Sequence, residues 1–137
     1  MTVTGKGNYV GSAQATFKIM DPVEEFVARL YRVCLDREPE AQGHAWWVAR
    51  LRAKQETGGS CAWGFFDSTE FKNHKYSNSA FLDHAYLAFF DRKADAAGKQ
   101  YWLGEMKRGM SREQVIRSGF AVSNEWKALY KVYQIKP

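Results

Sequence analysis

The sequence predicts a mainly α-helical protein: two tandem homologous units of three to four short helices packed together, with a short β-hairpin at the N-terminus. Three observations predict this class. Apolar residues follow a period of two before Asp21 and a helical period after it. The chain repeats its own motifs at a constant spacing. Both halves carry residues that start and stop helices, so local signals support the helical period.

The first 20 residues are predicted to form the hairpin. Apolar and polar side chains alternate along "SAQATFKI" (12–19), and "TGKGNYVG" (4–11) carries the glycines and the asparagine of a turn. An isolated two-stranded hairpin is marginally stable in water. We therefore expect it to lie against the helices, to pair with another chain, or to be the remnant of a preceding β domain.

The first helix is predicted to begin after Asp21. Asp21, Pro22 and Glu24 supply an N-cap, a proline at the first helical position and a reciprocal carboxylate three residues after the cap. Apolar residues then recur at steps of three and four. The helix is expected to end at "DREPE" (36–40), because Pro39 disfavours a helical conformation at Glu38.

The duplication is visible in two stretches, "LDREPEAQGHAWW" (35–47) and "FDRKADAAGKQYW" (90–102), which lie 55 residues apart. The same offset, with no gap, aligns "GFFDSTEF" (64–71) with "GFAVSNEW" (119–126). We interpret residues 21–75 and 76–137 as helical units 1 and 2 of one compact domain. The predicted structural core consists of aromatic residues at matching positions: Phe26, Tyr31, Trp47, Phe65, Phe81, Tyr86, Trp102, Phe120 and Trp126.

The second helix of each unit is predicted to start at Glu40 or Asp95, where a carboxylate suits the positive end of the helix dipole. Gly43 and Gly98 lie one turn into it, at a cost of about 1 kcal/mol relative to alanine, so close approach by another helix is expected there. The buried stripe of these helices is predicted to be Trp47, Val48 and Leu51 in unit 1 and Trp102, Leu103 and Met106 in unit 2.

Arg37 and Arg92 occupy equivalent places in the turn before that helix. The favoured interpretation is that each ties the turn through a carboxylate or free helix carbonyls. The alternative is a bidentate site for an external anion.

The chemistry-bearing residues predict no catalytic site, no metal site and no cofactor. "GSCAWGFF" (59–66) is similar to the surroundings of a papain-type nucleophile, but alanine follows Cys61, no histidine lies about 130 residues downstream, and the matching position in unit 2 is apolar. Cys34 also matches an apolar position. Both cysteines are expected to face inward, and either a disulfide, favoured in a secreted protein, or two reduced thiols fits the sequence.

The charge balance and hydropathy exclude several classes. There are 20 Lys and Arg against 15 Asp and Glu, a net charge of +5, but the signs are interspersed. A nucleic-acid partner is therefore not expected, although a nucleic-acid-binding helical domain is kept as an alternative function. No apolar run approaches the roughly 20 residues that span a bilayer, so membrane insertion is not expected.

The aromatic residues exceed what a small core needs. Trp46 and Tyr101 stand beside the core tryptophans but point elsewhere on their helices, and Trp63 matches a polar serine. Packing between the units is the favoured role of these rings, and stacking on sugar rings or bases is the alternative. The candidate ligand-binding residues are Trp46, Trp63, Tyr101, Arg37 and Arg92.

Two long stretches carry a family resemblance: "FVARLYRVCLDREPEAQGHAWWVARL" with "GFFDSTEF", and "FLDHAYLAFFDRKADAAGKQYWLGEM" with "GFAVSNEW". They resemble the repeats of the bacterial domain of unknown function 4214, over Asp21 to roughly Tyr133. The resemblance implies an all-helical, phycobilisome-linker-like module of secreted or surface-displayed proteins. It departs from the pattern at Asp36 and Asp91, where the family commonly has glycine, and at Ala94, where it often has proline. The leader also resembles the closing hairpin of an immunoglobulin-like surface repeat.

These features predict a non-catalytic helical binding or spacer module of a secreted or cell-surface bacterial protein. The expected partners are other domains of the same protein, a cell-wall glycan or a host protein. A glycan-binding module that uses exposed tryptophans is the alternative within this class. The sequence leaves the oligomeric state open.

Overall fold

The structure, a computed structural model, describes residues 21–133, so the predicted hairpin lies outside the described residues. The prediction of a mainly helical protein is confirmed, because all regular structure in this range is helical. The elements are α1 (Pro22–Leu35), α2 (Ala41–Arg52), α3 (Gly58–Phe66), α4 (Thr69–Asn73), α5 (Asn78–Phe90), α6 (Ala96–Lys107), α7 (Arg112–Gln114), the π-helix η2 (Val115–Gly119), the 3-10 helix η3 (Phe120–Val122) and α8 (Asn124–Tyr133). No helix in this range is long and apolar enough to cross a membrane.

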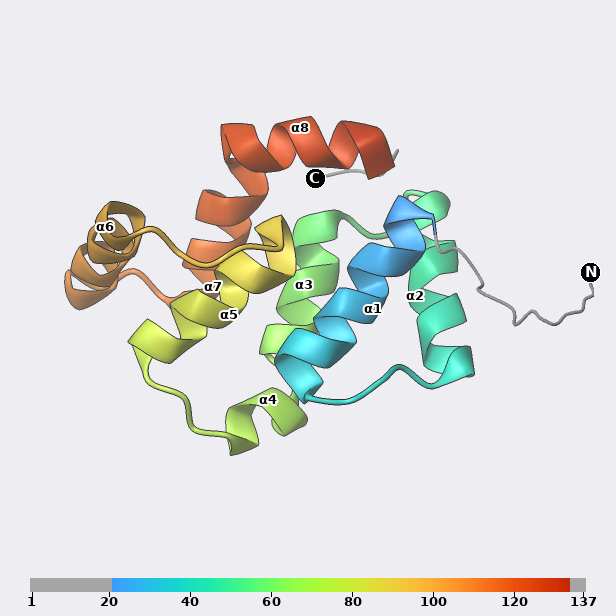
Figure 1. Ribbon diagram of the computed structural model, residues 1–137, viewed down its shortest axis with the longest axis horizontal. Coiled ribbons are helices and arrows are strands. Elements are labelled where there is room, and N and C mark those ends of the chain that lie inside the picture. The colour runs from blue at the N-terminus through green and yellow to red at the C-terminus, as the bar shows by residue number, and fades with distance from the viewer. Residues whose placement is uncertain (1–20, 134–137) are drawn as a thin grey trace, which may run out of the picture.

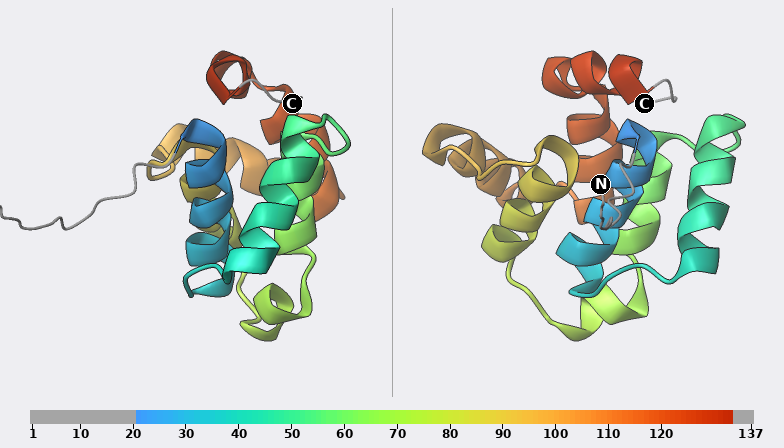
Figure 2. Two further views of the ribbon diagram at one scale, coloured as in Figure 1. Left: turned by 90° about the vertical axis from the view of Figure 1, so that its right-hand side faces the viewer. Right: turned by 45° about the vertical axis from the view of Figure 1, so that its right-hand side comes forward.

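The two units repeat the same arrangement around a central pair of helices. The first helices, α1 and α5, pack against each other at the centre of Figure 1. The second helices, α2 and α6, lie at opposite ends of the molecule, and the last helices, α4 and α8, lie below and above the central pair (Figures 1 and 2). Equivalent elements thus occupy opposite places about the α1–α5 contact.

Local signals explain the helix ends. Asp21 and Glu24 form the predicted capping box of α1, with Asp21 Oδ1 accepting from the Glu24 N–H at 2.9 Å. The central helices of the two units end at Asp36 (φ 55°) and Asp91 (φ 53°), both left-handed. Glycine adopts this conformation most easily, and aspartate tolerates it better than most residues. The glycine that the family resemblance implies at these two positions would adopt this backbone without strain.

The third helices of the two units differ in where they begin. Structural alignment of the two units therefore needs a local shift of one residue that the gap-free sequence alignment does not contain. Thr57 caps α3 and Ser111 caps α7, which puts these caps 54 residues apart rather than 55. The loop before Ser111 is one residue shorter than its counterpart, and the spacing from Ser111 to Ser123 is one residue longer than that from Thr57 to Ser68. The π-helix Val115–Gly119 absorbs the extra residue, because its wider turn adds one residue without breaking the helix.

One hydrophobic core connects both units. Phe26 of α1 packs 5.2 Å from Trp126 of α8, and the equivalent ring of α5, Phe81, packs 6.4 Å from Phe71 of α4. The first helix of each unit therefore contacts the last helix of the other, which places these four rings at the junction. All four are at most 1% exposed. Full burial of one such side chain contributes roughly 1.5–3 kcal/mol, so neither unit contains its core alone.

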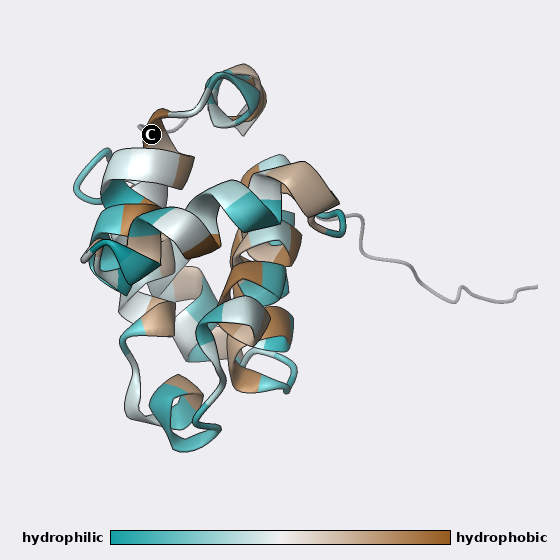
Figure 3. Ribbon diagram, turned by 90° about the vertical axis from the view of Figure 1, so that its left-hand side faces the viewer, coloured by the Kyte–Doolittle hydropathy of each residue, from teal (hydrophilic) through white to brown (hydrophobic). Residues whose placement is uncertain are grey.

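Seven of the nine predicted core aromatics are buried, at 0–5% exposure, but Trp47 and Trp102 are only partly buried. The stripe predicted to be buried on α6, Trp102, Leu103 and Met106, is only partly buried, and no residue of α6 is fully buried. The reason is its position: α2 packs on both α1 and α3, whereas α6 at the opposite end packs mainly on α5. Figure 3 shows hydrophilic and hydrophobic positions alternating around the helices, as expected where only one face is covered.

Candidate functional site

Each unit contains a chain of four aromatic rings that runs from solvent into the core, which we name the aromatic ladder. In unit 1, the ring centroids of Trp46 and Trp47 lie 4.8 Å apart at an interplanar angle of 82°. Trp47 and Phe65 follow at 5.5 Å and 40°, and Phe65 and Tyr31 at 4.9 Å and 76°. The ladder therefore connects α2, α3 and α1 through edge-to-face and tilted contacts, which aromatic pairs prefer.

Unit 2 repeats the ladder with nearly the same geometry. Tyr101 and Trp102 lie 5.0 Å apart at 77°, Trp102 and Phe120 at 5.4 Å and 40°, and Phe120 and Tyr86 at 5.0 Å and 77°. The agreement holds although the π-helix separates Phe120 from its cap by one extra residue. Packing has therefore kept the ring geometry where the backbone register changed.

The outer ring of each ladder is exposed. Trp46 is 52% exposed and Tyr101 is 58% exposed. The guanidinium of Arg50 lies over the Trp46 ring at 4.8 Å. Trp63, the third aromatic residue considered for binding, is partly buried against the core and belongs to neither ladder. The structure thus places Trp46 and Tyr101 at equivalent sites and separates Trp63 from them.

Arg37 and Arg92 cover the inner rings. Arg37 lies 5.2 Å from the Tyr31 centroid, and its Nε and Nη2 each donate to Glu70 at 3.0 Å. Its Nη1 donates to Glu40. Hydrogen bonding from Arg37 lowers the pKa of the Glu70 carboxyl. This bidentate geometry is the strong form of an ion pair and joins the turn after α1 to α4.

The same arrangement of an arginine over the inner ring and paired with a carboxylate of the last helix, which we name the arginine clamp, recurs in unit 2. Arg92 lies 5.1 Å from the Tyr86 centroid, and its Nε and Nη2 donate to Glu125 at 3.0 and 2.8 Å. Its Nη1 reaches Asp95 at 3.5 Å. Each guanidinium therefore faces two carboxylates. The arrangement matches the interpretation that these arginines tie the turn, and the surplus negative charge works against an external anion.

Glutamate and aspartate at the start of the second helix act differently because of their length. Asp95 reaches back to cap the helix and accepts from the Gly98 N–H at 2.8 Å. Glu40 makes no such cap and instead accepts from the Tyr31 hydroxyl at 3.0 Å. Burial, together with this hydrogen bond, raises the pKa of Tyr31 to about 12.

The close approach expected at Gly43 and Gly98 is made by a tyrosine. A Cβ at Gly43 would overlap the Tyr31 hydroxyl, and one at Gly98 would lie 2.5 Å from the Tyr86 hydroxyl. The glycines therefore leave space for the inner ring of each ladder.

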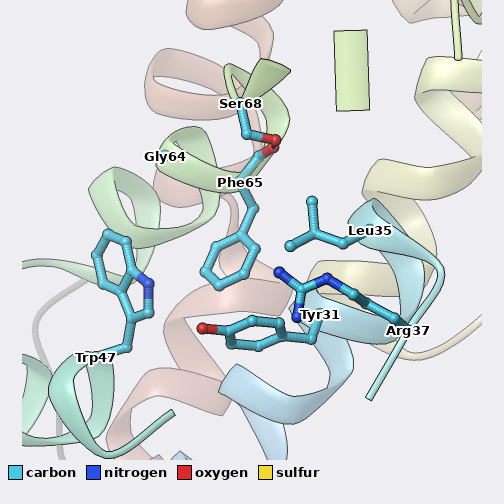
Figure 4. A pocket seen from close by; sticks show the side chains of 7 residues that line it. All are labelled: Tyr31, Leu35, Arg37, Trp47, Gly64, Phe65 and Ser68. Atoms are coloured by element: carbon cyan, nitrogen blue, oxygen red, sulfur yellow. Dashed lines mark hydrogen bonds between the residues drawn. The ribbon is translucent and has the colours of Figure 1, made fainter. Parts of the chain in front are cut away.

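A small pocket opens beside each ladder, and Figure 4 shows the one in unit 1. The unit 1 pocket has a volume of about 160 Å³ and the unit 2 pocket about 130 Å³. Tyr31, Leu35, Arg37, Trp47, Gly64, Phe65 and Ser68 line the first. Tyr86, Phe90, Arg92, Trp102, Phe120, Ser123 and Glu125 line the second. Every lining residue shared by the two pockets lies at the 55-residue offset, so the pockets are duplicated with the ladders.

The sequence did not assign the glycines that precede Phe65 and Phe120 to this site. Gly64 lines the first pocket, and a Cβ there would lie 3.2 Å from the Trp47 ring. Gly119 lies against Trp102 even more tightly. The available signal was a glycine inside an apolar helix at the same place in both units, which indicates close approach by another group.

The cysteines are free thiols inside the core. Cys34 is 1% exposed and Cys61 is 0% exposed, and no disulfide joins them. Of the two alternatives left by the sequence, the structure therefore has the reduced pair. Burial raises the pKa of both thiols well above its ordinary value, so they pack as small apolar residues.

Comparison with known proteins identifies the repeat. No curated protein and no solved structure matches the chain. The family model described as "Domain of unknown function (DUF4214)" matches residues 8–75 and residues 73–130. The first match begins before Asp21 and so includes part of the predicted hairpin segment. With two matches that together cover most of its length, the chain belongs to the DUF4214 family and carries the family's domain in tandem.

Proposed function

We propose that this chain is a non-catalytic binding module of a secreted or surface-displayed bacterial protein, and that its ligand is a glycan. The observation that carries the proposal is the repeated exposure of the outer ladder rings, Trp46 and Tyr101, at equivalent places in the two units. Tryptophan and tyrosine offer a flat apolar face with a polar edge, which suits the C–H face and hydroxyl rim of a sugar ring.

The inner residues support binding rather than catalysis. Arg37 and Arg92 each donate three hydrogen bonds to carboxylates of their own unit. The thiols of Cys34 and Cys61 are buried with raised pKa values, and a reactive cysteine needs the opposite. Within the described residues, no group of histidine, cysteine, aspartate and glutamate side chains is arranged to hold a metal ion.

The cellular setting and the partners are proposed from the family resemblance. The resemblance implies a module that stands beside other domains of a surface protein, so other domains of the same protein and a cell-wall glycan are the proposed partners. A spacer without a ligand is the alternative in the same class. A phycobilisome-linker-like fold and an immunoglobulin-like leader are proposed on the same resemblance.

The experiment is a binding screen of the 137-residue chain against insoluble and soluble bacterial cell-wall polysaccharides. Binding by the intact chain that is reduced in both Trp46→Ala and Tyr101→Ala supports the proposal. Val132→Ala is the matched control, because Val132 is 64% exposed and belongs to neither ladder. If the intact chain binds none of the polysaccharides, the glycan proposal is wrong. Duplex DNA in the same screen tests the nucleic-acid alternative, whose affinity must fall steeply with added salt.

A further inference from the structure

The two pockets beside the ladders specify a narrower ligand than a glycan in general. This step rests on the proposed function. We propose that each pocket holds the acetamido group of an N-acetylated amino sugar while the outer ladder ring stacks on the sugar itself, which gives two equivalent sites per chain.

Pocket size selects a substituent rather than a whole sugar. The volumes are about 160 and 130 Å³. An engineered apolar cavity of about 150 Å³ holds one benzene molecule, which has six heavy atoms. A hexopyranose has about twice as many, so the ring stays outside. An acetamido group, with four heavy atoms, fits either pocket.

The walls select an apolar end. In unit 1 the rings of Tyr31, Trp47 and Phe65 line the space together with Leu35 (Figure 4). In unit 2, Phe90 occupies the position equivalent to Leu35. A methyl group is suited to the faces of these rings, because they offer it apolar contacts.

The rim selects a neutral acceptor. A guanidinium has five N–H donors. Arg37 uses three of them and Arg92 uses four in hydrogen bonds within the described residues. At least one donor therefore remains at each pocket edge for a carbonyl oxygen.

A negatively charged ligand fits the rim poorly. Arg37 already faces Glu40 and Glu70, and Arg92 faces Asp95 and Glu125. Each cluster thus carries one positive and two negative charges. An amide carbonyl combines an acceptor with no net charge, and its methyl group is apolar, so an acetamido group matches both the rim and the walls.

The outer rings place the sugar. Trp46 makes a T-shaped contact with Trp47, which lines the first pocket, and Tyr101 makes the same contact with Trp102 at the second. In each unit the outer ring therefore contacts a tryptophan that lines the pocket. Because α2 and α6 lie at opposite ends of the molecule (Figure 1), the two sites engage separate sugar chains or distant parts of one.

The test compares two probes that differ mainly in the acetamido group: the β-1,4-linked tetramer of N-acetylglucosamine and the β-1,4-linked tetramer of glucose. Binding to the full chain is measured by titration calorimetry for stoichiometry and by NMR of the tryptophan indole N–H signals, which detects millimolar affinities. We expect two equivalent sites for the acetylated tetramer and at least tenfold weaker binding of the glucose tetramer.

Variants assign the two sites. Trp46→Ala and Tyr101→Ala, both at exposed positions, are each expected to leave one site, and the double variant none, while Val132→Ala retains both. Far-UV circular dichroism checks that each variant is folded. Equal binding of the two tetramers overturns the acetamido assignment and leaves glycan binding standing. A single site, or binding unaffected by the double variant, overturns the assignment to the pockets. Failure to bind any polysaccharide in the wider screen removes the proposed function itself.

Discussion

The repeat offers a matched pair of substitutions, Gly64→Ala and Gly119→Ala, whose effects on stability should have opposite signs. At Gly64, which lies inside α3, alanine gains about 1 kcal/mol of helix propensity. Its Cβ would lie 3.2 Å from the tip of the partly buried Trp47 ring, which borders an open pocket and can move by a few tenths of an ångström. The expected change in the free energy of unfolding is therefore between zero and an increase of about 1 kcal/mol.

At Gly119 the balance is reversed. Its backbone (φ −110°, ψ −75°) departs from the α-helix at the end of the π-helix, so little propensity is gained. A Cβ there would overlap the Trp102 ring, reaching 2.8 Å from Cζ3 and closer still to its neighbouring atom. Trp102 is packed on Phe120 at 5.4 Å, so its displacement breaks the second ladder. Overpacking of this kind costs about 1–3 kcal/mol.

The two variants should therefore differ by about 2 kcal/mol, or on the order of 5–10 °C in Tm. Urea denaturation followed by far-UV circular dichroism measures the difference, with an unchanged slope as the check on two-state unfolding. Indole fluorescence should change more in Gly119→Ala than in Gly64→Ala. Equal losses in both variants, or a Gly119→Ala protein as stable as the parent, would show that Trp102 does not lie where the ladder places it.

The remaining predictions concern the clamp, the thiols and the shared core. Because Arg37 lowers the folded-state pKa of Glu70, this carboxylate adds stability above its unfolded pKa of about 4.3. That contribution to stability is lost as the pH falls through the folded-state pKa of Glu70. Glu70→Gln should therefore flatten the pH dependence of the free energy of unfolding between about pH 5 and 3. An unchanged pH dependence in this variant contradicts the ion pair. Cys34 and Cys61 should both be unreactive toward a thiol reagent at pH 8 in the native protein and both react in denaturant, whereas zero reactive thiols after denaturation would indicate a disulfide. Phe81→Ala should cost about 3–5 kcal/mol and lower one common unfolding transition; two separated transitions would mean that the units fold independently.

Much of the site was predictable because the duplication allows the two halves of the sequence to be compared with each other. Arg37 and Arg92 recur with a carboxylate 33 residues later in both units, and the structure pairs each with that residue. The exposed outer rings were also indicated, since Trp46 and Tyr101 sit beside the ring that faces the core. The pockets were not predictable, because their volume depends on how three helices meet.

The one-residue register change shows where this comparison fails. The loop before Ser111 is one residue shorter than in unit 1, and the segment after it is one residue longer. The spacing between equivalent residues therefore returns to 55, and the sequence alignment shows no change. Only hydrogen bonding in the folded chain separates an α-helix from a π-helix of the same apolar pattern.

The sequence by itself determined the repeated unit and the start of α1, because a capping box depends on residues within one helical turn of each other. Tertiary structure alone decided how deeply equivalent residues are buried. Val48 of α2 is 5% exposed, whereas α6 at the opposite end has no buried residue. The physical reason is that burial is set by neighbouring helices, and an internal duplication repeats a helix without repeating its neighbours.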